Sequence, residues 1–147
     1  MALADEIPHG SRIAFDTNAI IYIYFVEEHT QFFPVLRPVF AMLANGQATG
    51  VVSVVTLLEV LVRPLRLDRH DLAQRYRDVL SHNLAITALD VMISERAASL
   101  RAALRLAVVD AVIAATALEC SCTHLVTNDP AFRNVDGMRI LVIGEYV

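Results

Sequence analysis

The chain has 147 residues, a formal net charge of −4, and 56% hydrophobic residues. This length predicts one domain with a substantial core. The mild negative charge argues against a generally basic nucleic-acid-binding coat, but not against an enzyme that cuts nucleic acid at an acidic centre. The high apolar fraction predicts that part of the surface is covered by a partner or by a second copy of the chain.

Neither export nor membrane insertion is expected. Apolar runs such as Val51 to Val62 are too short to span a bilayer, and this one contains Glu59. The first residues show no basic segment followed by an apolar core, so no signal peptide is expected. Cys120 and Cys122 stand one residue apart, a spacing that suits neither a structural disulfide nor a zinc pair. We therefore expect free thiols in a cytoplasmic protein.

The first half of the chain contains two predicted strands, each followed by helical sequence. A polar lead-in over residues 1–11 precedes a strand at 12–15 and helices at 19–25 and 32–44. Asn45-Gly46 is a stop signal for the second helix. A strand at 49–53 then passes into a helix at 54–62, which Arg63-Pro64 is expected to end.

The second half continues the alternation. A polar helix is expected over residues 67–82 with Asp68 as its cap, followed by a strand at 85–89. Asp90 is expected to cap a helix that runs to residue 105, and a small-residue helix follows at 109–120. Strands at 124–127 and 138–143 flank a turn or short helix at 130–132. This order predicts a single domain over residues 1–147 with a three-layer α/β/α fold and a central, mainly parallel sheet of about five strands.

Four acids interrupt stretches that are otherwise apolar: Asp16, Glu59, Asp110 and Asp129. Asp16 and Asp129 follow the ends of predicted strands, Glu59 lies two turns into a helix after a strand, and Asp110 begins a helix. Because the carboxyl ends of parallel strands gather at one edge of the sheet, we expect the four acids to converge there. A carboxylate in apolar surroundings is costly unless it is paired or bound to a cation.

Each acid also has an ordinary structural explanation. Asp16, Asp110 and Asp129 could cap the helices beside them, and Glu59 could pair with Arg63 four residues later. These explanations are plausible for each acid alone and weaker for all four together, because converging carboxylates repel one another unless a divalent cation lies among them.

The polar neighbours of the acids favour a metal site. Hard oxygen ligands indicate Mg²⁺ or Mn²⁺ rather than zinc or copper. Ser53, Thr56 and Glu59 recur at steps of three and form one polar stripe on their helix. Three further neutral residues could hold water around the ion: Asn18, Thr127 and Asn128.

These residues lie in motifs that resemble those of the PIN-domain family, and most closely those of VapC-type toxin ribonucleases from toxin–antitoxin pairs. The match runs from Ile13 to about Val142, through the motifs Phe15 to Asn18, Ser53 to Glu59, Asp110 to Leu118 and Leu125 to Phe132. The resemblance implies that Asp16, Glu59, Asp110 and Asp129 form a metal centre for the hydrolysis of RNA. It also implies a homodimer and a cognate antitoxin that blocks the acidic cleft. One departure is that Val108 and Val109 stand where members often have a proline, which concerns the start of that helix rather than the acid.

Two other functions are alternatives. A haloacid-dehalogenase-like phosphatase would have its second acid at Asn18 and use a basic residue, usually Lys. The basic residues of this chain are all Arg, so neither that reaction nor a Walker-A nucleotide site is favoured. A catalytically silent PIN-like binding module is disfavoured because all four acids are present.

Two surface features concern partners. Arg63, Arg66 and Arg69 lie in a polar segment beside Glu59 and could contact RNA phosphates. The alternative is an ordinary solvated face, because acids alternate with the arginines there. The aromatic run from Ile20 to Phe33 could belong to the core or line a groove for a partner helix.

Overall fold

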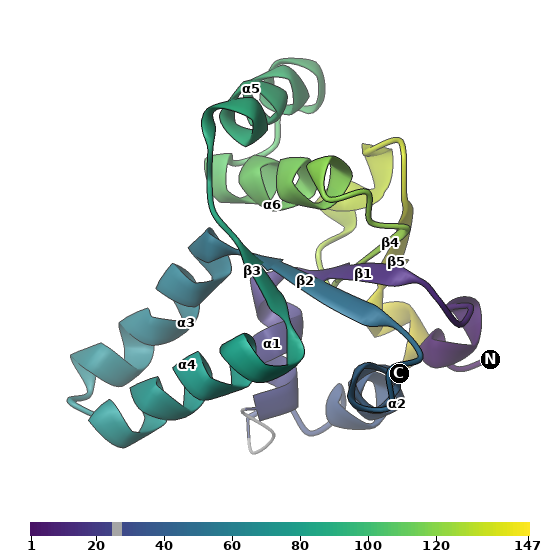
Figure 1. Ribbon diagram of the computed structural model, residues 1–147. Helices are drawn as coiled ribbons and strands as arrows, with labels where there is room; N and C mark the ends of the chain where they lie inside the picture. The colour runs from purple at the N-terminus through teal and green to yellow at the C-terminus, as the bar shows by residue number, and fades with distance from the viewer. Residues whose placement is uncertain (25–27) are drawn as a thin grey trace.

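A parallel sheet of five strands lies between two layers of helices in the computed structural model, which describes residues 1–24 and 28–147 (Figure 1). The strand order is β3-β2-β1-β4-β5, and every neighbouring pair is parallel. The strands are β1 (Arg12–Phe15), β2 (Thr49–Ser53), β3 (Ala85–Thr87), β4 (His124–Thr127) and β5 (Arg139–Val142). The predicted three-layer α/β/α fold is confirmed, with β1 in the middle of the sheet.

The helices cover both faces of the sheet (Figure 1). One face carries α1 (Thr17–Tyr24), α2 (Phe33–Ala44), α3 (Val54–Arg66), α4 (His70–Asn83) and the 3-10 helices η1 (Leu3–Glu6) and η3 (Ile143–Tyr146). The other face carries α5 (Val91–Leu104), α6 (Val108–Glu119) and the 3-10 helix η2 (Pro130–Asn134). No helix in the described part of the chain is long and apolar enough to cross a membrane.

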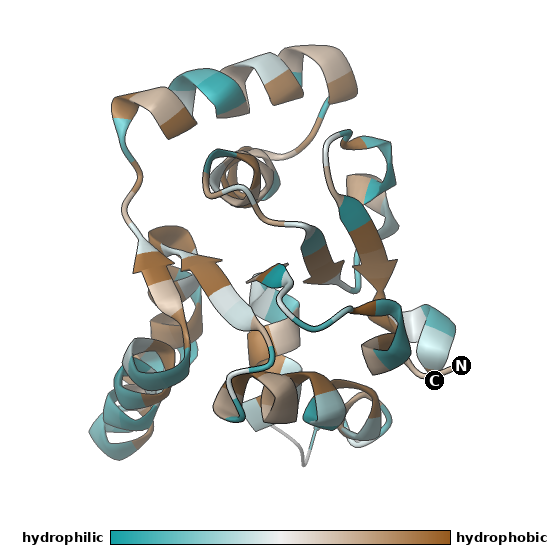
Figure 2. Ribbon diagram, turned by 45° about the vertical axis from the view of Figure 1, so that its right-hand side comes forward, coloured by the Kyte–Doolittle hydropathy of each residue, from teal (hydrophilic) through white to brown (hydrophobic). Residues whose placement is uncertain are grey.

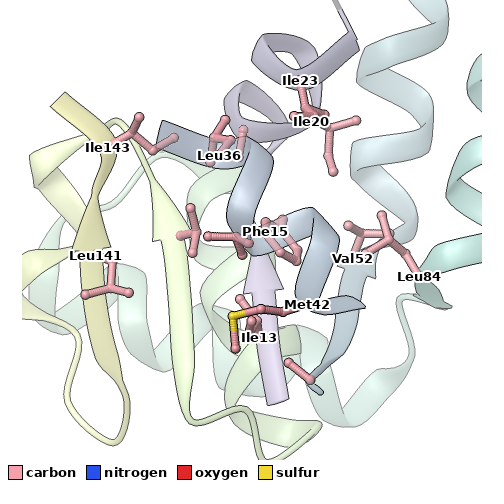
Figure 3. Packing of buried hydrophobic residues seen from close by; sticks show 14 of the residues in the cluster. Ile13, Phe15, Ile20, Ile23, Leu36, Met42, Val52, Leu84, Leu141 and Ile143 are labelled. Carbon is pink, nitrogen blue, oxygen red and sulfur yellow. The ribbon is translucent and has the colours of Figure 1, made fainter. Parts of the chain in front are cut away.

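The two cores follow from the alternation of side chains along the strands. Ile13 and Phe15 belong to the core under α1 and α2, whereas Ala14 between them belongs to the core under α5 and α6. Figure 3 shows Phe15 in the first core with Met42 of α2 and Val52 of β2 nearby. Figure 2 shows hydrophobic residues on the strands at the centre of the molecule. Fully burying a side chain such as Phe15 stabilises the fold by about 2 kcal/mol, so β1 is firmly held from both sides.

The predicted polar lead-in contributes to the core. Leu3 in η1 is fully buried, and Ile7 just after η1 is also buried. Both pack into the core under α1 and α2. The interpretation of residues 1–11 as merely polar was therefore wrong, because two apolar side chains in that stretch have partners far along the chain.

Three α-helices have bounds that differ from expectation by more than one residue. Helix α3 continues through Pro64 to Arg66; a proline near a helix end removes only one backbone hydrogen bond, and this ring is buried. Asp68 does not cap α4, since the cap position is Arg69, and Asp68 has φ +55° with its carboxylate bonded to His70. The helix predicted over residues 19–25 begins at Thr17, and its predicted last residue, Phe25, lies outside the described residues.

Two other predictions are confirmed. Asp90 caps α5, with its Oδ1 atom accepting a hydrogen bond from the Ile93 amide at 2.8 Å. Cys120 and Cys122 are both free thiols.

Candidate metal centre

The candidate site lies where β1 and β4 end side by side. Phe15 is in register with Val126, and the Asp16 amide donates to the Val126 carbonyl at 3.0 Å. After this point β1 leads into α1 on one face of the sheet, and β4 leads into η2 on the other face. The chain therefore diverges above and below the sheet, which is the arrangement that opens a ligand crevice in parallel α/β folds.

Asp16 is the buried centre of the site, with only 6% of its surface exposed. Its Oδ1 atom accepts a hydrogen bond from the Thr17 amide at 2.7 Å. Its Oδ2 atom accepts from the Thr127 hydroxyl at 2.7 Å and from the Asn18 amide group at 3.2 Å. Burial raises the pKa of Asp16 to about 6, with the charges of Asp110 and Glu59 adding to the rise and the bonds from Thr127 and Thr17 opposing it. Three hydrogen bonds thus hold the Asp16 carboxylate in place, but they do not fully offset the cost of burying its negative charge.

Glu59 reaches the same site from α3. The Thr17 hydroxyl donates to Glu59 Oε1 at 2.5 Å, and the Thr56 hydroxyl lies 3.1 Å from the Thr17 hydroxyl. Arg63, the partner that sequence spacing offered for Glu59, forms two hydrogen bonds with Glu28, at 2.7 and 2.6 Å. Glu59 is therefore held by a residue beside Asp16 rather than by a pairing along its own helix.

Asp110 and Asp129 complete the group of acids. Asp110 lies in the first turn of α6, whose cap position is Ala107, so the capping explanation for Asp110 was wrong. Burial raises the pKa of Asp110, and the charges of Asp129 and Glu59 raise it further. Asp129 does cap η2, since its Oδ1 atom accepts from the Ala131 amide at 2.9 Å. Capping and membership of the acidic group coexist in Asp129.

The predicted neutral residues connect the acids to the rest of the fold. Thr127 accepts a hydrogen bond from the Asp129 amide at 3.0 Å while it donates to Asp16. The Asn128 amide donates to Asn18 Oδ1 at 3.2 Å, and Asn18 in turn donates to Asp16. These three residues therefore position the acids through protein hydrogen bonds.

The oxygen donors fit Mg²⁺ or Mn²⁺ chemically. Asp16 experiences the charges of Asp110 and Glu59, and Asp110 experiences those of Asp129 and Glu59, so the four acids form one electrostatic group. Among the described residues, no three His, Cys, Asp or Glu side chains come close enough together to hold one ion. Mg²⁺ usually keeps several of its waters and takes only one or two carboxylates directly.

The sequence did not predict the roles of two residues in this hydrogen-bond network. Thr17 was not among the predicted site residues, yet it bonds the carboxylates of both Asp16 and Glu59. Thr56, fully buried, was noted only as part of a polar stripe, and it contacts Thr17. The available signal was the step of three residues between Thr56 and Glu59, which places both on one side of α3.

The arginines predicted to contact RNA form no hydrogen bond with any of the four acids in the described part of the chain. Arg63 is paired with Glu28, and Arg69 is paired with Asp71 through two bonds of 3.0 Å. Arg66 forms no ion pair with any residue that the structure describes. The solvated, ion-paired alternative therefore describes Arg63 and Arg69 in this state of the protein.

Comparison with known proteins identifies the fold family. The PIN-domain sequence profile matches residues 13–138. No curated protein matches the chain significantly. A toxin–antitoxin complex from Klebsiella pneumoniae contains a chain that is 26% identical, with a TM-score of 0.67 over 89% of this chain and 97% of that one.

Two other solved structures share the fold at lower identity. VapBC2 from Rickettsia felis, bound to a DNA fragment from its promoter, is 18% identical with a TM-score of 0.69, over 89% of this chain and 98% of that one. VapBC-1 from nontypeable Haemophilus influenzae is 16% identical with a TM-score of 0.68, over 90% and 98%. The matched residues include all four acids and cover most of the chain, so this protein belongs to the PIN-domain family, as its motifs predicted.

Proposed function

We propose that this protein is a metal-dependent endoribonuclease that hydrolyses RNA phosphodiester bonds, and that it acts in the cytoplasm as the toxin of a VapBC-type toxin–antitoxin pair. The observation that carries this proposal is the gathering of four acids at the end of the central strands. They come from separate stretches of sequence, and each of them except Glu59 follows or begins an element at that edge of the sheet. A fold that needed only helix caps would have no reason to bring four mutually repelling carboxylates together.

The proposed metal ligands are Asp16, Glu59, Asp110 and Asp129, of which one or two would bind the ion directly and the others through its waters. A bound Mg²⁺ or Mn²⁺ would supply an activated water and offset the negative charge that develops on the phosphate. Asp16 would be the fixed ligand because three protein donors hold it. Of the four acids, only Asp110 accepts no hydrogen bond from the described residues, and it is partly exposed. We assign it the role of accepting the proton from the attacking water.

RNA binding would use the exposed arginines in the last turn of α3 and at the start of α4. Arg66 is available without breaking an ion pair within the described residues. Arg63 and Arg69 would exchange Glu28 and Asp71 for phosphate groups, and exposed ion pairs contribute only about 0–1 kcal/mol. Binding through such contacts weakens as the salt concentration rises.

Partner binding is supported by the exposed apolar surface. Leu58, Val62 and Leu65 follow one another along α3 at steps of four and three, and all three are exposed. Such an apolar stripe on a solvent-exposed helix face is suited to burial against another protein surface. We propose a homodimer from this apolar stripe, and a cognate antitoxin because a toxin–antitoxin complex shares the fold. Light scattering of the purified chain tests the dimer, and co-purification with the product of a neighbouring small gene tests the antitoxin.

The function is tested by incubating the purified, partner-free protein with structured RNA and Mg²⁺ or Mn²⁺. Cleavage that chelation stops and that Asp16→Asn abolishes is expected. A catalytically silent binding module would retain RNA without cutting it. A haloacid-type phosphatase would instead release phosphate from an aryl phosphate, and that result with intact RNA would overturn the proposal.

A further inference from the structure

Thr17 donates hydrogen bonds to the carboxylates of two of the four acids. Its backbone amide donates to Asp16 Oδ1 at 2.7 Å, and its hydroxyl donates to Glu59 Oε1 at 2.5 Å. The second distance is typical of a hydroxyl bonded to a charged carboxylate. Thr17 is only 6% exposed, so its hydroxyl has little access to water and depends on these protein partners.

The hydrogen bonds that link Thr56, Thr17 and Glu59 all run in the same donor-to-acceptor direction. A threonine hydroxyl has a single proton, and that of Thr17 is used on Glu59. The contact of 3.1 Å between the Thr17 and Thr56 hydroxyls therefore requires Thr56 to be the donor. Thr56 is fully buried, so Thr17 is also its hydrogen-bond partner in the core. The order is Thr56 to Thr17 to Glu59, and this order fixes the rotamer of the Thr17 side chain.

This series of hydrogen bonds opposes the repulsion between the Asp16 and Glu59 carboxylates. Asp16 sits on a rigid strand end, whereas Glu59 is carried by a long side chain on α3 that has several rotamers. Both carboxylates accept hydrogen bonds from the same residue, Thr17, so they lie close enough to repel each other. Without a donor between them, Glu59 would lower its energy by turning away from Asp16.

We propose that Thr17 is a positioning residue that sets the separation of the Asp16 and Glu59 carboxylates and so prepares them for a divalent cation. Its effect on RNA cleavage rests on the proposed nuclease function, whereas its effect on cation binding does not. Thr127 plays the matching part on the other side, since it bonds Asp16 and the backbone amide of Asp129. Asp16 is thus flanked by two buried threonines, each of which leads to another acid.

Three variants test the role of the Thr17 hydroxyl. Thr17→Val keeps the shape and the backbone amide but removes the hydroxyl, and Thr17→Ser restores the hydroxyl. Thr116→Val is the matched control, because Thr116 is equally buried and its hydroxyl donates to the Val112 carbonyl within α6. Mn²⁺ binding is measured by calorimetry on the folded proteins, and RNA cleavage is measured as a function of Mn²⁺ concentration.

Thr17→Val is expected to raise the Mn²⁺ dissociation constant by about 10- to 100-fold, and added Mn²⁺ should restore part of its cleavage. Thr17→Ser and Thr116→Val should bind Mn²⁺ as the wild type does. A Thr17→Val protein with wild-type Mn²⁺ affinity overturns the proposal. So does a Thr17→Ser protein as defective as Thr17→Val, since the methyl group rather than the hydroxyl would then matter.

The same measurements separate this proposal from the nuclease proposal. If the wild type binds Mn²⁺ but cuts no RNA, the nuclease function fails, and the Mn²⁺ titrations of the variants still decide the role of Thr17. If the wild type binds no Mn²⁺, both proposals fail. If RNA is cut equally by wild type and Thr17→Val at limiting Mn²⁺, only the role of Thr17 fails.

Discussion

The acidic site has two unlike sides. On the strand side, Asp16 ends β1, is almost completely buried, and accepts hydrogen bonds from three donors. On the helix side, Asp110 lies in the first turn of α6, is partly exposed, and accepts no hydrogen bond from the described residues. Burial raises the pKa of both acids, and the shift of Asp16 is large enough to bring its pKa to about 6. One carboxylate is therefore fixed by hydrogen bonds, whereas the other is open to solvent.

The difference follows from the elements that carry each acid. The position of Asp16 is set by the register of β1 with β4, in which Phe15 faces Val126. The position of Asp110 is set by the packing of α6 on the sheet and on α5, which leaves its side chain at the rim. A site that must bind a cation and then turn over a substrate can combine a preorganised half with a half that adjusts.

The largest effect is expected from removing the charge on the strand side. Asp16→Asn keeps the shape of the side chain but removes the central negative charge, and RNA cleavage should fall by about 10³-fold or more, equivalent to several kcal/mol of lost transition-state stabilisation. The matched control is Asp136→Asn, which removes an exposed acid and should cut RNA at the wild-type rate. Equal activity of Asp16→Asn and wild type would remove Asp16 from the centre of the mechanism.

The second prediction concerns the pH dependence of stability in metal-free protein. Because the pKa of Asp16 is raised from 3.8 to about 6, folding favours its protonated form. Its stabilising contribution is complete below pH 3.8 and is lost as the pH rises through about 6. Between about pH 4 and pH 7 the free energy of unfolding should therefore fall by about 3 kcal/mol more in wild type than in Asp16→Asn.

Urea denaturation at a series of pH values measures this difference. Asp110→Asn should remove a smaller share of the pH dependence, because Asp110 is more exposed. Adding Mn²⁺ should reduce the loss in wild type, because a cation favours the charged carboxylates. Parallel pH profiles for wild type and Asp16→Asn would show that Asp16 is not desolvated in solution.

The third prediction weakens the strand side without touching a charge. Thr127→Val removes the donor to Asp16 Oδ2 and leaves the Asp129 amide without its acceptor. The expected loss of stability at neutral pH is about 1–3 kcal/mol. It should shrink at acid pH, since the Thr127 bond lowers the pKa of Asp16 and so favours the charged form. Thr116→Val, whose hydroxyl bonds only within α6, should lack this pH dependence.

The strand side of the site was predictable from sequence, because its signals are local. The strand at residues 12–15, apolar from Ile13 onward, ends at Asp16, and the strand at residues 124–127 ends just before Asn128 and Asp129. Both acids therefore follow a strand end, whatever the pairing of the strands. A parallel sheet then brings strand ends to one edge. The family resemblance added the roles of Glu59 and Asp110, which periodicity alone would not assign.

What sequence reasoning missed depends on contacts between distant segments. The bond from Thr17 to Glu59 joins residues 42 positions apart and exists only because α3 packs beside α1. Leu3 was taken for part of a polar lead-in because its buried partners lie elsewhere in the chain. Pro64 was expected to end α3 from its local chemistry, but the burial of its ring stabilises the final turn.

The smallest effect is expected where the strand side meets the end of the chain. The Gly144 amide donates to Asn128 Oδ1 at 2.8 Å, and a Cβ atom at position 144 would lie 3.0 Å from that oxygen. Gly144→Ala should therefore displace the Asn128 side chain by a few tenths of an ångström. The Asn128 backbone amide, not its side chain, bonds Asn18. The displacement should reach Asp16 only weakly, with a loss of less than about 1 kcal/mol in stability and a few-fold loss in cleavage.

A double-mutant cycle measures how much of the effect of Gly144→Ala passes through the Asn128 side chain. Asn128→Ala removes the oxygen that the new methyl group would press against, so the effect of Gly144→Ala should largely disappear in the Asn128→Ala background. The Gly144 backbone amide also donates to the Asn128 side chain, and a coupling of about 0.5 kcal/mol or more between the two substitutions is expected. Strict additivity would mean that the methyl group disturbs the η3 backbone instead. In that case the C-terminal 3-10 helix would contribute nothing to the rigidity of the strand side.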